Sequence, residues 1–242
     1  MVTTLKIELF AGIKRLLALR GPALKAIIYG VVWYFFPTWL FVCIAIVLYF
    51  IPSFQSSSFL SLFIGILVVA IWAPASVWYA IFLAILFGWL LSVKDLMFID
   101  RRLSYEMLIF ATTFLLLHQF YASFGTLDGF ALLAAFFIAA LVGWMVKTLF
   151  LNFNNHDDGD EAEKGIAFRL VGILVWQAIT VCFFLPLDAI YQSVVAFLLI
   201  VPIIDILSIR LSGGFSREKI FMTSGFAFTL LILVLVSPPW RP

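Results

Sequence analysis

The acidic side chain best placed for chemistry is Asp205, which follows Val201-Pro202-Ile203-Ile204 inside an apolar stretch. Polar groups within apolar spans are the default place to look for function. Pro202 frees a backbone carbonyl, and a partly desolvated carboxylate near it could carry a proton or bind a cation. The simpler interpretation is that Asp205 pairs with Arg210, or reaches an interface about 6–8 Å away by helical rise.

His118 and Gln177 are the other polar candidates within apolar stretches. His118 could titrate near neutral pH, although an interfacial hydrogen bond to a neighbour is the simpler role. Gln177 is typical of side chains that hydrogen-bond between helices. The acidic loop 152–165 offers oxygen ligands, but it lacks the alternating spacing and closing Glu of an EF-hand. A solvated acidic loop is therefore the expectation there.

Motifs for cofactors and catalysis are missing from the sequence. Cys43 and Cys182 have no second Cys or His at ligand spacing. There is no phosphate-binding loop, no Gly-x-Ser-x-Gly and no His-Glu-x-x-His. The two His residues lie in different segments, which disfavours haem ligation between helices. We expect no metal, no cofactor, no nucleic-acid partner and a role that is not catalytic.

The composition points to lipid as the solvent of these residues. Hydrophobic residues make up 65% of the 242 residues and charged ones only 12%, and the mean hydropathy is +1.17. A soluble domain is about 45–50% apolar and about 25% charged. So few polar groups could not cover a soluble fold of this length. The sequence therefore predicts an all-α integral membrane protein, a polytopic bundle of helices.

Two regions follow from the hydropathy pattern. Residues 1–25 predict an amphipathic helix on the cytoplasmic face of the membrane, and residues 26–242 predict a single transmembrane domain. The apolar blocks in that domain are 27–51, with a kink expected at Pro37, then 59–93, 105–121, 129–150, 168–185, 189–209 and 220–236. Ser104, Asp128, Asp188 and Ser216 stand where helix N-caps are expected.

The lysines and arginines predict the orientation of the chain. If 59–93 crosses the membrane once, all 15 of them except Arg241 fall on one side, which the positive-inside bias makes cytoplasmic. If 59–93 is a hairpin, they divide almost evenly. The charge bias favours seven crossings, with 75–93 as the span and 59–72 as a re-entrant or interfacial segment broken off at Pro74. The alternative is eight transmembrane helices.

Small residues at a spacing of four predict the faces on which helices pack. Two such ladders are present: Ala80, Ala84 and Gly88 in one block, and Ala131, Ala135, Ala139 and Gly143 in another.

These patterns favour a non-catalytic structural or accessory subunit of a membrane assembly. Its expected partners are the lipid bilayer and other membrane subunits or further copies of itself. Its expected location is a bacterial cytoplasmic membrane, with the amino terminus inside. A small transporter or channel that uses Asp205 is one alternative, and a lipid-modifying enzyme is another.

Overall fold

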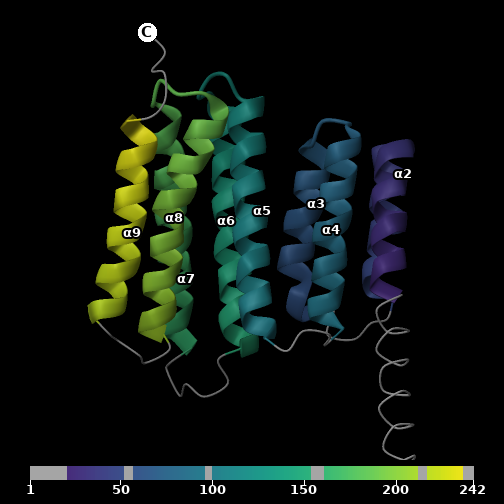
Figure 1. Ribbon diagram of the computed structural model, residues 1–242, viewed down its shortest axis with the longest axis horizontal. Coiled ribbons are helices and arrows are strands. Elements are labelled where there is room, and N and C mark those ends of the chain that lie inside the picture. The colour runs from purple at the N-terminus through teal and green to yellow at the C-terminus, as the bar shows by residue number, and fades with distance from the viewer. Residues whose placement is uncertain (1–20, 52–56, 96–99, 154–160, 212–216, 237–242) are drawn as a thin grey trace, which may run out of the picture. The chain divides into compact units, whose positions relative to one another are not determined.

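The computed structural model describes residues 21–51, 57–95, 100–153, 161–211 and 217–236, which form helices joined by short turns and contain no strand (Figure 1). Residues 1–20 of the predicted amphipathic segment and 154–160 of the predicted acidic loop lie outside these residues. The two ends of the predicted loop, 152–153 and 161–165, belong to helices. The chain divides into two units, Met1–Leu108 and Ile109–Pro242. Each unit is described by itself.

The first unit begins with a hairpin of two short helices. Residues 21–35 are helical, and α2 (Thr38–Phe50) runs back beside them. The rings of Tyr29 and Phe41 meet with centroids 5.0 Å apart, and Lys25 Nζ donates to the Ile51 carbonyl. Both contacts require the two helices to be antiparallel. The prediction of one kinked span over 27–51 is therefore wrong.

Pro37 reverses the chain because it ends one helix and starts the next. It sits at the N-cap of α2 with φ −62° and ψ 149°, an extended conformation. A proline has no N–H to continue the preceding helix, and its ring disfavours helical geometry at the residue before it. The sequence alone did not distinguish a kink from a full reversal at this position.

A second hairpin follows. The short turn η1 (Ser57–Phe59) leads into α3 (Leu60–Trp72), and α4 (Val77–Lys94) returns after a break around Pro74, as predicted. Phe59 at the start of α3 lies against the beginning of α5 (Arg101–Ser123), because its ring centroid is 5.2 Å from that of Tyr105. Residues 59 and 94 therefore lie at the same end of this unit. The expectation that 75–93 spans while 59–72 is a re-entrant or interfacial segment is not confirmed, because α3 and α4 form a hairpin.

The second unit holds longer helices. The rest of α5 is followed by α6 (Gly129–Phe153), α7 (Glu161–Phe183), α8 (Ala189–Leu211) and α9 (Arg217–Val236). α6 packs on α7, α7 on α8, and α8 on α9. The Tyr121 hydroxyl in α5 donates to the Ile179 carbonyl in α7 at 2.8 Å.

Two of the predicted N-caps can be compared with the structure. Asp128 is confirmed, because its Oδ1 accepts from the Ala131 N–H at 2.8 Å. The expectation for Ser104 is wrong: α5 begins at Arg101, and Asp100 Oδ1 accepts from the Leu103 N–H at 3.0 Å.

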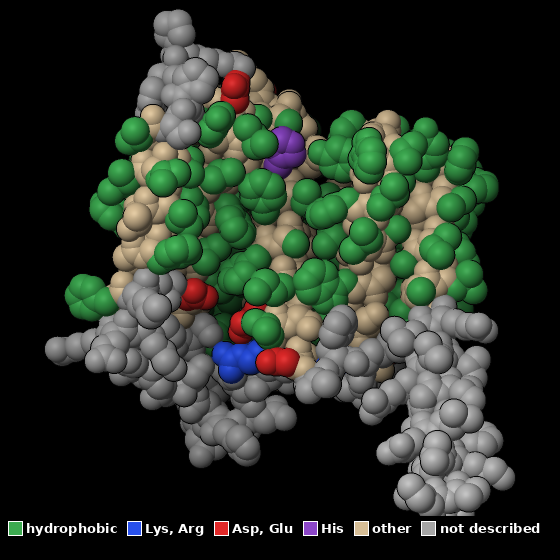
Figure 2. Space-filling model, viewed as in Figure 1, with side chains coloured by type: hydrophobic (Ala, Val, Ile, Leu, Met, Phe, Trp, Pro, Cys, Tyr) green, Lys and Arg blue, Asp and Glu red, His purple; other side chains and the backbone are tan. Residues whose placement is uncertain are grey.

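Four of the described helices are long and apolar enough to cross a membrane: Val77–Lys94, Arg101–Ser123, Gly129–Leu151 and Ala189–Leu207. Shorter apolar helices lie at Thr38–Phe50, Ser57–Trp72, Phe168–Phe183 and Ser224–Val236. Figure 2 shows hydrophobic side chains spread widely over the described surface. Trp78, Phe130 and Phe35 are 80%, 76% and 73% exposed, which suits a surface that faces lipid.

Basic side chains cap the ends of the short helices in the first unit. Lys25 Nζ and Lys94 Nζ donate to the carbonyls of Ile51 and Tyr49, both at the end of α2. Arg101 Nε donates to the Val93 carbonyl, at the end of α4, at 3.1 Å. The last carbonyls of a helix have no partner within the helix and carry its negative pole. These cations therefore join each helix end to a neighbouring segment.

Lys94 is the most enclosed of these cations, since its side chain is fully buried. Its Nζ also lies 4.8 Å from the centroid of the Tyr49 ring, within range of a cation–π contact. The ring of Phe63, in α3, stacks on the ring of Tyr49 with the two centroids 4.2 Å apart. Lys94 thus fixes the end of α2 against α4.

We predict that Lys94→Met destabilises the protein more than Lys25→Met. The first change leaves the Tyr49 carbonyl buried without this donor, which costs about 1–3 kcal/mol. The second affects an exposed bond that water can replace, for a loss of about 0.5 kcal/mol. Thermal unfolding in detergent, followed by far-UV circular dichroism, measures the difference. Equal melting temperatures for the two variants would contradict this role of Lys94.

Candidate functional site

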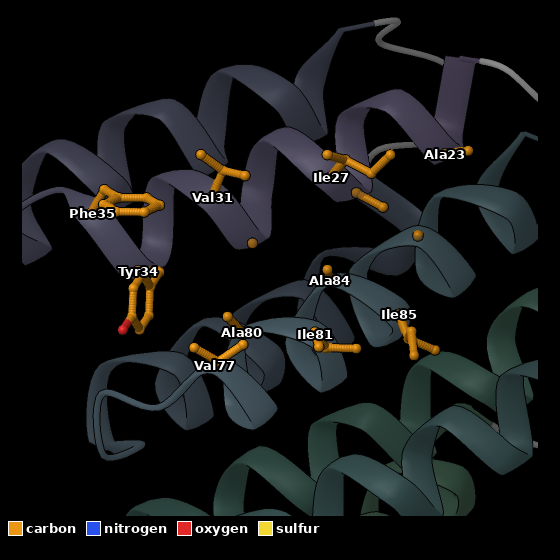
Figure 3. A pocket seen from close by; sticks show the side chains of 13 residues that line it. Ala23, Ile27, Val31, Tyr34, Phe35, Val77, Ala80, Ile81, Ala84 and Ile85 are labelled. Atoms are coloured by element: carbon orange, nitrogen blue, oxygen red, sulfur yellow. The ribbon is translucent and has the colours of Figure 1, made fainter.

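The first unit contains a groove between helix 21–35 and α4 (Figure 3), with a volume of about 600 Å³. We call it the first groove. Two rows of side chains, each at a spacing of four residues, form its walls. They are Ile27, Val31 and Phe35 on one side, and Val77, Ile81 and Ile85 on the other. All six are exposed, from 47% at Val31 to 73% at Phe35.

Small residues bring the two backbones together at the floor of the first groove. A Cβ on Gly30 would lie 2.9 Å from the Ala84 Cβ and 3.0 Å from the Ala80 carbonyl oxygen. A Cβ on Gly88 would lie 2.8 Å from the Ala26 Cβ. The predicted ladder Ala80, Ala84 and Gly88 therefore meets helix 21–35.

The first groove is almost wholly apolar. The Tyr34 hydroxyl is the only polar side-chain group among its lining residues. Sites for small polar ligands carry several placed polar groups that fix orientation. Rows of side chains separated by a groove are, in contrast, the surface on which helices pack. Its chemistry suits another apolar helix better than a polar substrate.

A second groove, of about 500 Å³, lies between α6 and α7. A Cβ on Gly143 would lie 3.4 Å from the Phe168 carbonyl oxygen and 3.6 Å from the Gly172 Cα, so these backbones are also close. Ala131, Ala135 and Ala139, the rest of the predicted ladder, are buried. Unlike the first groove, this one is lined at one end by two cations, Lys147 and Arg169.

The predicted polar candidates lie on three different helices. Asp205 is half-buried in α8 and interacts with neighbouring atoms, while the side chain of Arg210 lies outside the described residues. Gln177 is exposed on α7, and no hydrogen bond joins it to the described part of the chain. His118 is half-buried in α5, and its Nδ1 is enclosed without a partner among the described residues. No contact joins these described side chains into one site.

Sequence reasoning missed two buried hydroxyls in α5. Thr112 and Thr113 are fully buried, and neither hydroxyl has a hydrogen-bond partner in the described structure. Adjacent threonines inside an apolar stretch were the available signal. Within the described ranges, no three His, Cys, Asp or Glu side chains gather to hold a metal ion. The transport and lipid-modifying roles stay predictions.

Comparison with known proteins adds no relative: no family model, curated protein or solved structure matches the chain.

We predict that Gly30→Ala destabilises the protein, although alanine favours a helix by about 1 kcal/mol over glycine. The added methyl would sit too close to Ala84 and Ala80, and such overpacking costs about 1–3 kcal/mol. Gly225→Ala in α9 is the matched control, because a Cβ there meets nothing within 4 Å. Melting temperatures in detergent should fall for the first variant and stay level or rise for the second. A rise for both would rule out the close contact at Gly30.

Proposed function

We propose that the chain is a polytopic integral membrane protein of a bacterial cytoplasmic membrane, with its amino terminus in the cytoplasm. We further propose that it is a non-catalytic accessory subunit that holds a transmembrane helix of another subunit in the first groove. The exposed rows of apolar side chains along that groove are the observation that carries the proposal.

The order of the helices supports the orientation. Lys and Arg gather in the amino-terminal segment and in 94–102, 147–169 and 210–219. An even number of described helices separates each of these segments from the next. With antiparallel hairpins, all of them come to one side, and only Arg241 follows the last helix. Because the chain also reverses at Pro37, a hairpin over 59–93 no longer divides the basic residues between the two sides. The charge bias then places all of these segments in the cytoplasm.

The short helices support a role in assembly. α2 and α3 have 13 residues each, about 20 Å by helical rise, against a hydrocarbon core of about 30 Å. Helices of this length need packing partners to bury their end groups in a bilayer. The first groove, formed by helix 21–35 and α4 of the same unit, offers an exposed apolar surface for a partner of that unit. Its close backbone contacts show that helix 21–35 and α4 already pack by the small-residue mechanism that operates in lipid.

A labelling experiment tests the orientation. Single cysteines at Ser57, Asp100 and Gly125, in a chain with Cys43→Ser and Cys182→Ala, are exposed to a membrane-impermeant maleimide in intact cells and in inverted vesicles. We expect Ser57→Cys and Asp100→Cys to react only in inverted vesicles, and Gly125→Cys only in intact cells. Opposite sidedness of the first two would refute the second hairpin in the membrane.

Photocrosslinking tests the partner helix. A photoreactive amino acid at Ile27 or Ile81, on the two walls of the first groove, should give the same protein adduct in native membranes. Ile28 and Phe82 are matched controls, since each is the exposed next residue on its helix and does not line the groove. We expect no such protein adduct from these controls, because their side chains do not line the groove.

The identity of the adduct decides the outcome. Mass spectrometry should identify a membrane-spanning polypeptide captured from both groove positions. A product of twice the chain mass of 27.3 kDa would show a second copy instead and overturn the accessory role. Adducts to lipid alone, or equal adducts at the controls, would overturn the groove as a protein-binding surface.

A further inference from the structure

The second groove differs from the first in the charge at one end. Lys147 and Arg169 are both exposed and line the groove from opposite sides, Lys147 on α6 and Arg169 on α7. Gly165, about one turn before Arg169 on α7, also lines the groove, and a Cβ there would meet nothing within 4 Å. No ion pair joins either cation to an acidic side chain within the described ranges. The end of the groove therefore has room and positive charge.

The rest of the second groove is apolar. Phe136, Ala140 and Trp144 form a row of exposed side chains on α6, and Ile173 faces them from α7. The floor is formed by Gly143 and Gly172, where the helices come closest. Two cations at one end of an otherwise apolar groove match a molecule with an anionic headgroup and a hydrocarbon tail. A free anion would contact the two cations but has no apolar part to place in the rest of the groove.

We infer that the second groove binds a phospholipid with an anionic headgroup. Its phosphate lies between Lys147 and Arg169, and one acyl chain follows the apolar part of the groove. Basic pockets between membrane helices on the cytoplasmic side are suited to anionic lipids, and a guanidinium can form paired hydrogen bonds with phosphate oxygens. This inference rests on the proposed membrane placement, in which Lys147 and Arg169 lie on the cytoplasmic side.

Lipid retention measured by native mass spectrometry tests the site. The purified full chain, in mild detergent, is incubated with phosphatidylglycerol or with phosphatidylcholine of the same acyl chains. We expect the protein to prefer phosphatidylglycerol. Lys147→Gln and Arg169→Gln should each weaken this binding about fivefold, the effect of one cation near an anionic lipid. Arg102→Gln is the matched control, because it removes a cation outside the groove that pairs with Glu106 at 3.1 Å.

A second variant tests the apolar part of the groove separately from the charge. Ala140→Trp fills the apolar part of the groove and should reduce retention of both lipids, while Leu133→Trp places the same side chain at an exposed position outside the groove and should not. Circular dichroism confirms that the variants are folded. Unchanged phosphatidylglycerol binding in Lys147→Gln/Arg169→Gln would overturn the inference. Inorganic phosphate that displaces the lipid completely would show a site for the anion only and overturn it as well.

Failure of the membrane placement is visible separately. Alkaline extraction of native membranes should leave the chain in the pellet. Release into the supernatant would refute the proposed membrane placement, whatever the lipid measurement shows. A chain that stays in the pellet but shows no preference for phosphatidylglycerol would refute the lipid site alone.

Discussion

The carbonyl groups at the ends of short helices are the constraint on which the first unit depends. A helix of 13 residues leaves several backbone groups unpaired at each end, and in apolar surroundings each one is costly. Lys25, Lys94 and Arg101 supply donors from other segments to the ends of α2 and α4. These three basic side chains thus complete the hydrogen bonding of the helix ends. In this way α2, a helix of only 13 residues, is held within a packed unit.

Close helix contacts repeat in both units, with different surroundings. Gly30 and Gly88 bring helix 21–35 against α4, and Gly143 with Gly172 brings α6 against α7. Each contact leaves a groove beside it, because small residues cannot fill the space between the neighbouring rows of large ones. The first groove is apolar throughout its lining apart from Tyr34, whereas the second ends at Lys147 and Arg169. The same packing rule therefore leaves an apolar groove in one unit and a groove with two cations at one end in the other.

The arrangement also shows where chemistry is concentrated. His118 and the threonines of α5, Gln177 of α7 and Asp205 of α8 are distributed over three helices, and none of them lines either of the two grooves. The two grooves, in contrast, gather many side chains of one kind in a continuous surface. For this reason the proposed function is built on surfaces and their occupants, with Asp205 left as a single half-buried carboxylate that interacts with its neighbours.

The sequence by itself determined the helical class, the break at Pro74 and the cap at Asp128. All of these depend on local periodicity or on one residue's backbone chemistry. Only the tertiary structure decided that Pro37 reverses the chain, since a proline permits either a kink or a turn and the choice depends on what the following helix packs against. It also decided which backbone meets each ladder, that Lys94 caps α2 rather than its own helix, and that Lys147 and Arg169 share one groove. Those are contacts between residues distant in sequence, and a spacing of four along one helix carries no information about its partner.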